Sequence, residues 1–307
     1  MQWRSELQNE FSWSKSRDAL FATCLRAYYY HYYGSWNGWR RDAPADVREL
    51  YIMKNLQSIS TWRGGLVHDV VKEVITGISE RRPLSADQAT EAVRERVRRD
   101  LNDSTSGRYR SRPNRRCGLQ EHYYSLPISD ESLSETVAIM ERCVESFLGT
   151  RTYSTILELG PESIMEFEKL RSMTLSGCKV WVSPDVIVRG PDDSVMIVDW
   201  KTGLSTVSKE TKLQLAIYGI YTARTYNLPL DQLLGVEENL RLDERHIFPL
   251  DAGMLEETRR YIEDSVRSMQ GLLHDRERNI ALIRDLPMTE DPSVCRDCRF
   301  RRACDRE

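Results

Sequence analysis

Several features that define whole classes of protein are missing from this sequence. No apolar run approaches the roughly 20 residues that a bilayer-spanning helix needs, and the N-terminal stretch has no signal-peptide-like hydrophobic segment. Net charge is also nearly absent, because 44 Lys and Arg almost balance 47 Asp and Glu to leave −3. We therefore expect a cytoplasmic protein with no membrane partner, which holds any polyanion through local basic patches.

Two further absences narrow the possibilities. The chain has no internal repeat and no Gly-x-x-x-x-Gly-Lys phosphate loop, so a helicase or another enzyme of that type is not indicated. In the cytosol a disulfide framework is also not expected, and an odd total of seven cysteines with three close together near the end points to metal ligation plus buried thiols. What remains is a folded chain of 307 residues whose 40% apolar content is ample for a packed core.

The first half of the chain has mainly helical periodicity. Apolar spacing and N-cap residues predict helices over residues 14–33, 46–58, 61–78, 85–101 and 132–148. Between the last two, residues 102–118 are rich in Ser, Gly, Pro and Asn and carry five arginines. Their composition predicts a mobile, solvated loop, and a second reading, in which Tyr109 and the arginines lie along a phosphate backbone, stays open.

The second half alternates between strand and helix signals. Strands are predicted over residues 163–167, 180–188, 195–200, 234–240 and 246–250, with helices over 213–226 and 255–273. A turn-rich stretch at 190–193 joins two of the strands into a hairpin. The pattern predicts an α/β fold with a helical region over 1–150, a core over 151–285 and a cysteine-bearing tail over 286–307.

The predicted hairpin carries two carboxylates and a lysine. Asp185 begins or interrupts one strand, and Asp199 ends the neighbouring strand, so the two carboxylates are expected to converge. Lys201 lies two residues further on and projects to the same face as Asp199. Paired carboxylates suit Mg²⁺ or Mn²⁺, which stabilise the charge that develops when water attacks a phosphodiester. A strand-end Asp and an exposed Lys are nevertheless common in any α/β protein.

The order of these residues resembles a known family. The run Pro184-Asp185, a hairpin-length gap, and Asp199-Trp200-Lys201-Thr202-Gly203 resembles the RecB-like branch of the PD-(D/E)XK nuclease superfamily. Upstream, Gly64 to His68 resembles the Gly-x-x-x-His element of that branch, and downstream the pair Gln214 and Tyr218 resembles its Gln-x-x-x-Tyr element. Each element alone is also common in unrelated proteins. All four occur here in the family order, and this order favours the resemblance.

The resemblance implies a fold and a set of roles. It implies a restriction-endonuclease-like α/β core with a mixed central sheet, in which His68, Asp185 and Asp199 hold Mg²⁺ or Mn²⁺. Lys201 would act on the attacking water, and Gln214 with Tyr218 would position the nucleic acid. A further acidic ligand is common in this branch, and three candidates stay open: Glu168, Glu166 and Glu162.

Near the C-terminus, Cys295, Cys298 and Cys304 form a C-x₂-C-x₅-C pattern that lacks a fourth ligand nearby. His274 lies outside the usual zinc-finger spacing, so Cys24 becomes the natural fourth ligand. The layout resembles AddB and CRISPR-associated adaptation nucleases, in which one early and three late cysteines hold a 4Fe-4S cluster. The resemblance implies a structural cluster that joins the tail to the N-terminal helix, with zinc as the alternative.

The function implied is a metal-dependent deoxyribonuclease, an exonuclease acting on single-stranded DNA or DNA ends. The competing reading is a non-catalytic or partner-activated iron-sulfur DNA-binding subunit of a repair or antiphage defence complex, with possible protein partners. A third reading is an enzyme directed at RNA. The remaining cysteines, Cys117, Cys143 and Cys178, are expected to be unligated, because no comparable spacing recruits them.

Overall fold

The fold is that of a computed structural model, which describes residues 8–204 and 208–305. The first residues of the chain, where no signal peptide is expected, lie outside this range. The chain forms two compact units, one made of residues 57–171 and 182–259, and the other of residues 1–56, 172–181 and 260–307. Among the helices of the described residues, none is long and apolar enough to cross a bilayer.

The unit of residues 57–171 and 182–259 is built on a five-stranded sheet. In spatial order its strands are β1 (Ile164–Phe167), β4 (Val186–Arg189), β5 (Val195–Lys201), β6 (Leu233–Asn239) and β7 (Glu244–Pro249). Strands β5 and β6 run parallel, and the other neighbours are antiparallel. The predicted α/β fold with a mixed sheet is therefore confirmed.

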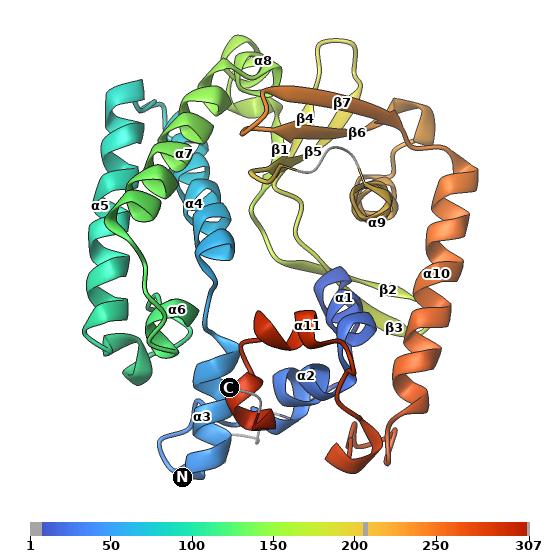
Figure 1. The fold of residues 1–307 in the computed structure, drawn as a ribbon. Coiled ribbons are helices and arrows are strands. Elements are labelled where there is room, and N and C mark those ends of the chain that lie inside the picture. Colours follow the sequence, from blue (N-terminus) through green and yellow to red (C-terminus); the bar gives the residue numbers. More distant parts are fainter. Residues whose placement is uncertain (1–7, 205–207, 306–307) are drawn as a thin grey trace, which may run out of the picture. The chain divides into compact units, whose positions relative to one another are not determined.

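Helices cover both faces of this sheet (Figure 1). On one face α4 (Ile59–Ser79), α5 (Ala86–Thr105) and α7 (Asp130–Gly149) pack side by side, because each presents a continuous apolar stripe to one core. On the other face α9 (Lys209–Tyr226) contacts β5 and β6. Shorter helices complete the unit: η2 (Arg108–Ser111), α6 (Gln120–Tyr123), α8 (Arg151–Leu159), η3 (Pro161–Ser163) and η4 (Leu230–Gln232).

Alternation along the strands separates core residues from polar ones. Val198 and Trp200 belong to the apolar core beneath α4 and α7. Successive side chains point to opposite faces of a sheet, so Asp199 and Lys201 face the other way, towards α9. Val186 pairs with Val198 in the antiparallel register, which places Asp185 opposite Asp199 one residue further along. Polar residues therefore gather where β4 begins and β5 ends.

The other unit joins three distant parts of the sequence. It contains α1 (Lys15–Thr23), α2 (Leu25–Tyr29), the π-helical turn η1 (Tyr30–Gly34), α3 (Ala45–Lys54), most of the hairpin of β2 (Arg171–Leu175) and β3 (Cys178–Val182), most of α10 (Ala252–Gly271), η5 (Ile283–Asp285), α11 (Pro292–Arg296) and η6 (Arg301–Cys304). At its centre the buried Arg17 guanidinium donates to the hydroxyls of Tyr28 at 2.9 Å and Tyr33 at 2.8 Å.

Two predicted elements are each divided in the structure. The helix predicted over 14–33 is broken at Cys24, whose backbone is extended with φ of −161° and ψ of 117°. The break lets α1 and α2 fold back so that Arg17 reaches Tyr28, and these tertiary contacts outweigh helical periodicity. The strand predicted over 180–188 is split into β3 and β4 around Pro184, which has no N–H to donate to a ladder.

The prediction of a mobile loop over residues 102–118 was wrong. Helix α5 continues to Thr105, a 3₁₀ turn follows, and the Tyr109 side chain is only 4% exposed. Arg116 donates to Asp103 at 2.7 Å. Composition alone predicted a solvated segment. It does not reveal that one aromatic side chain, Tyr109, is buried and attaches the segment to the core. Helix α8 and strand β2 were also not predicted.

Candidate active site

Four elements of the unit of residues 57–171 and 182–259 supply the candidate site. His68 lies on α4, Glu168 follows the last residue of β1, Asp185 precedes β4, and Asp199 lies near the end of β5. The sheet thus brings two strand ends together while the helix adds an imidazole, although these residues are as much as 131 positions apart in sequence.

His68, Glu168 and Asp185 form a compact group of ligand-type side chains. The His68 Nδ1 atom lies 3.4 Å from Asp185 Oδ1 and 3.5 Å from Glu168 Oε1, and the ligand atoms all lie within 4.8 Å of one another. Glu168 adopts a left-handed backbone with φ of +46°, and its N–H donates to the Asp185 carbonyl at 2.9 Å. This bond aims the Glu168 side chain at the group.

Asp199 faces a second set of polar side chains. Its carboxylate forms an ion pair with Lys201, and its Oδ1 accepts a hydrogen bond from Gln214 Nε2 at 2.8 Å. The Gln214 side chain also accepts from Lys201 Nζ at 3.2 Å and donates to the Tyr218 hydroxyl at 2.8 Å. Gln214 and Tyr218 share one face of α9 because they are four residues apart. They therefore brace the lysine and the aspartate together.

The donor set fits a hard divalent cation. Within the described part of the chain, Glu168 Oε1 is a buried oxygen that lies 3.5 Å from His68 Nδ1, and Asp199 Oδ2 is a buried oxygen that pairs with Lys201. Buried oxygens of this kind are costly unless a cation or water satisfies them. Carboxylate oxygens with an imidazole suit Mg²⁺ or Mn²⁺. Residues present in the structure therefore match the cation that the sequence predicts.

The charges of the site shift its pKa values. Burial opposes protonation of His68, but the carboxylates of Asp185 and Glu168 outweigh it and hold the His68 pKa well above its usual range. Burial and the nearby Asp185 raise the pKa of Asp199 to about 6, against the opposing charge of Lys201. The Lys201 pKa is raised, because attraction to Asp199 exceeds the effect of burial. The lysine is thus a fixed positive charge at neutral pH.

The peptide of Trp200 supports both halves of the site. Its N–H donates to Asp185 Oδ2 at 2.7 Å, and its carbonyl lies 3.1 Å from His68 Nε2. The indole Nε1–H donates to the buried Glu238 at 3.0 Å. Glu238 also accepts from the Thr152 hydroxyl at 2.8 Å and forms an ion pair with Arg245. A buried network behind the sheet therefore fixes the strand that carries the site.

We expect Arg245→Ala to lower the free energy of unfolding by about 3–5 kcal/mol, because the Glu238 carboxylate would stay buried without its cation. Urea unfolding followed by circular dichroism measures the change. Glu244→Ala on the same strand is the control. Because the Glu244 side chain is exposed, we expect this variant to change the free energy of unfolding by no more than about 0.5 kcal/mol. A loss equal to that of Glu244→Ala would contradict a structural role for the network.

A close approach explains the glycine of the Gly-x-x-x-His element. A Cβ atom on Gly64 would lie 3.2 Å from Thr202 Oγ1, in the segment that follows Lys201. Glycine therefore lets α4 come near the end of β5, which in turn brings His68 to the site. Any larger side chain at this position would have to displace the threonine.

The three candidates for a further acidic ligand have different surroundings. Glu168 lies in the group with His68 and Asp185. Glu166 is buried against α9, where the hydroxyls of Tyr221 and Tyr226 donate to it. Glu162 lies on the surface beside Arg81. Only Glu168 of the three is therefore in a position to share a cation with His68.

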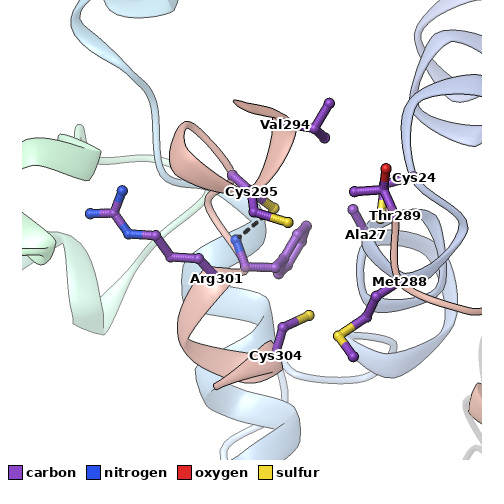
Figure 2. A pocket seen from close by; sticks show the side chains of 10 residues that line it. Cys24, Ala27, Met288, Thr289, Val294, Cys295, Arg301 and Cys304 are labelled. Atoms are coloured by element: carbon purple, nitrogen blue, oxygen red, sulfur yellow. Dashed lines mark hydrogen bonds between the residues drawn. The ribbon is translucent and has the colours of Figure 1, made fainter. Parts of the chain in front are cut away.

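The four cysteines of the predicted cluster line one pocket of the other unit. Cys24, Cys295, Cys298 and Cys304 border it together with apolar side chains, among them Ala27, Met288, Val294 and Phe300. Figure 2 shows Cys24 across the pocket from Cys295 and Cys304. Among the described residues, no three cysteine sulfurs lie within 4.8 Å of one another. All seven described cysteines are free thiols.

A comparison with models of known protein families identifies the family of the chain. The family model of the PD-(D/E)XK nuclease superfamily matches residues 12–305, and the chain therefore belongs to that superfamily. A solved structure titled "Crystal structure of SSO0001" is similar to it with 16% sequence identity and a TM-score of 0.27, over 60% of this chain and 91% of that one. No curated protein matches the sequence.

Proposed function

We propose that the protein is a metal-dependent deoxyribonuclease. The observation that carries the proposal is the meeting of His68, Glu168 and Asp185 in one group, beside an aspartate that is paired with Lys201. Nucleases of this superfamily hydrolyse phosphodiester bonds, and a carboxylate group with an adjacent ammonium suits that reaction. Family membership without this convergence would be equally compatible with a non-catalytic member of the superfamily.

Each side chain has a proposed role. His68, Asp185 and Asp199 hold Mg²⁺ or Mn²⁺, and Glu168 is a further ligand. When bound, the cation supplies positive charge to the phosphate oxygens of the substrate. Lys201 orients the attacking water and balances the negative charge of the transition state.

The remaining polar side chains position the reactive groups. Gln214 bridges Asp199 and Lys201, so it keeps the ammonium at a fixed place relative to the cation site. Tyr218 holds Gln214 in turn. Burial raises the Tyr218 pKa, so the hydroxyl stays protonated and remains a donor. We propose that this pair also contacts the scissile strand.

The substrate proposed is single-stranded DNA or DNA ends, which the enzyme degrades as an exonuclease. The RecB-like order of elements supports this choice, since His68, Asp185, Asp199-x-Lys201 and Gln214-x-x-x-Tyr218 follow one another as in that branch. Purified protein is tested on single-stranded DNA, duplex DNA and RNA with Mn²⁺ and with EDTA. Cleavage of DNA only with the cation is expected. Absence of metal-dependent cleavage of every substrate would refute catalysis.

We expect His68→Ala to raise the Mn²⁺ concentration needed for half-maximal cleavage by at least about 10–100-fold. Metal affinity typically falls by this factor when a residue that only supports a ligand is replaced, and loss of a ligand should cost at least as much. The reason is that the variant loses a nitrogen ligand from the group. A Mn²⁺ titration of the cleavage rate measures the shift. His246→Ala is the matched control, because that half-exposed histidine on β7 contacts Glu244. An unchanged titration in His68→Ala would remove the imidazole from the proposed cation site.

We further propose that Cys24, Cys295, Cys298 and Cys304 bind a 4Fe-4S cluster. Four thiols border one largely apolar pocket, and the Phe300 N–H donates to Cys298 Sγ at 3.4 Å, as is common for cluster ligands. A single zinc ion with Zn–S bonds of about 2.3 Å would need the sulfurs about 3.8 Å apart. A cluster that takes one cysteine per iron accommodates wider spacing.

The proposed cluster would be structural. The Arg26 backbone N–H and side chain donate to the carbonyls of Pro287 and Leu286, and the Tyr30 hydroxyl donates to Ala303. These bonds already join α2 and η1 to the tail, and shared ligands would reinforce them. The reducing cytosol that the sequence predicts would keep these thiols free to bind the cluster.

A further inference from the structure

Helix α4 runs along the edge of the sheet at which the candidate site lies. Three of its residues, each four positions from the next, lie at three neighbouring strand ends. Gly64 approaches the segment that follows β5, and His68 lies beside Asp185, which precedes β4. The Lys72 ammonium donates to the carbonyl of Glu168, which follows β1, at 3.5 Å. Lys72 therefore lies at the candidate site, one helical turn beyond the imidazole.

The turn that carries Glu168 is fixed from several sides. The Glu168 N–H donates to the Asp185 carbonyl at 2.9 Å. The Arg171 Nε–H donates to the buried Glu166 at 3.2 Å, so an ion pair closes the turn around Glu168. The Tyr221 hydroxyl donates to the same Glu166 carboxylate at 3.1 Å and attaches the turn to α9. The carbonyl that accepts from the lysine therefore has a fixed position relative to the ligand group.

The Lys72 ammonium has donors to spare. Lys72 is exposed, and the Glu168 carbonyl takes one of the three ammonium protons. Within the described ranges of the chain, no ion pair joins Lys72 to a carboxylate, and the adjoining Glu73 pairs with Arg96 at 2.5 Å. The other two cations of the site are engaged, because His68 and Lys201 each contact carboxylates. Lys72 thus adds a positive charge that an anionic ligand can use.

The position of this charge matches the repeat of a nucleic acid strand. Four residues of α-helix rise about 6 Å, so Lys72 lies about this far along α4 from His68. Neighbouring phosphates of an extended strand have a comparable separation. If the scissile phosphate lies at the cation group, the next phosphate of the strand is therefore within reach of Lys72. An ammonium suits a phosphate oxygen as a compact point charge.

We infer that Lys72 binds the phosphate next to the scissile one and so positions the DNA strand. The inference rests on the proposed nuclease function and adds a subsite to it. Exposed lysines on helices are ordinarily solvated side chains, and Lys72 differs from them in its contact with the residue that supplies a proposed ligand. The subsite requires a substrate with at least two phosphates, which favours a polynucleotide over a simple phosphodiester.

The test uses single-stranded DNA oligonucleotides in which one phosphate at a time is replaced by a neutral methylphosphonate. A denaturing gel gives the cleavage rate at each bond with Mn²⁺, at DNA concentrations below KM. In the natural protein, a neutral linkage on one side of a bond is expected to slow its cleavage by about 5-fold, the upper range for an exposed ion pair. Lys72→Met should slow cleavage of unmodified DNA by the same factor and lose its sensitivity to the neutral linkage.

Two further variants separate charge from structure. Lys72→Arg keeps the charge and should keep the sensitivity to the neutral linkage. Lys212→Met is the matched control, because Lys212 is an exposed lysine of α9 beside Phe248, and this variant should cleave as the natural protein does. A Lys72→Met protein that remains sensitive to the neutral linkage overturns the inference.

A Mn²⁺ titration of the cleavage rate tests whether Lys72 acts through Glu168 instead. Loss of a neighbouring positive charge does not weaken the attraction of a cation, so Lys72→Met should need no more Mn²⁺ than the natural protein. A higher Mn²⁺ requirement would mean that Lys72 supports the Glu168 ligand, and it would overturn the inference.

A binding measurement keeps the test independent of cleavage. Fluorescence anisotropy of a single-stranded oligonucleotide in EDTA gives the log–log salt slope, which Lys72→Met should make shallower by about 0.7, as for one lost phosphate contact. Lys212→Met should leave the slope unchanged. An unchanged slope in Lys72→Met overturns the inference. Failure of the nuclease proposal appears separately, as absence of Mn²⁺-dependent cleavage by the natural protein.

Discussion

Lys201→Met is expected to lower kcat for DNA cleavage by at least about 10²–10³-fold, the range seen when one preorganised transition-state donor is removed. The ammonium is held by Asp199 and Gln214 beside the cation site, so no other described side chain replaces it there. Methionine keeps an unbranched side chain of similar length and removes the ammonium, with its charge and its hydrogen-bond donors. The measurement is the single-turnover cleavage rate at saturating Mn²⁺.

Lys212→Met is the matched control for this experiment. Lys212 is an exposed residue of α9 whose ammonium lies over the Phe248 ring at 5.5 Å. Its replacement removes the same charge from the same unit, and it should leave kcat unchanged. If Lys201→Met cleaved DNA at the natural rate while both variants kept their fold by circular dichroism, the lysine would have no part in the chemistry.

Cys298→Ser is expected to abolish iron binding and to lower the thermal stability of anaerobically purified protein. Hydroxyl is a poor substitute for thiolate, and loss of one ligand opens a link between α2 and the tail. Such a link closes a loop of more than 250 residues, whose closure entropy is worth several kcal/mol. Visible absorption with iron and sulfide analysis measures the cluster, and calorimetry measures the stability.

Cys117→Ala provides the control for the cluster. Burial and the charge of Asp100 raise the pKa of Cys117 to about 12, so its sulfur remains a protonated thiol. This variant should keep its iron and lose only packing. If the natural protein contained zinc and neither iron nor sulfide, the proposed cluster would be wrong and the alternative metal correct. If Cys298→Ser kept its iron, this cysteine would not be a ligand.

Motif order predicted most of the candidate site from the sequence. Family order drew attention to His68, Asp185, Asp199 and Lys201, and the structure places them in the middle of α4, just before β4 and at the end of β5. The choice of Glu168 was left open, because it depends on where β1 ends and on a left-handed backbone at that residue. Neither property follows from residue type.

Other parts depend on tertiary contacts that a sequence pattern does not contain. The extended backbone at Cys24 follows from the packing of Arg17, and the folded state of residues 102–118 follows from the burial of Tyr109. The support of Trp200 by Glu238 was missed as well. An acidic pair, Glu237 and Glu238, within an apolar strand was the signal that could have revealed it, since buried carboxylates are rarely without partners.

The discontinuous unit of residues 1–56, 172–181 and 260–307 has a consequence for biogenesis. During synthesis on the ribosome, Cys24 emerges long before Cys304, so the early helices must wait for residues 260–307. The segment of residues 57–259, by contrast, contains the whole of the other unit and can fold while translation continues. A chain that stops before residue 260 would therefore contain the whole of the unit of residues 57–171 and 182–259, while its N-terminal helices would lack the later residues that they pack against, and such a species is prone to aggregation.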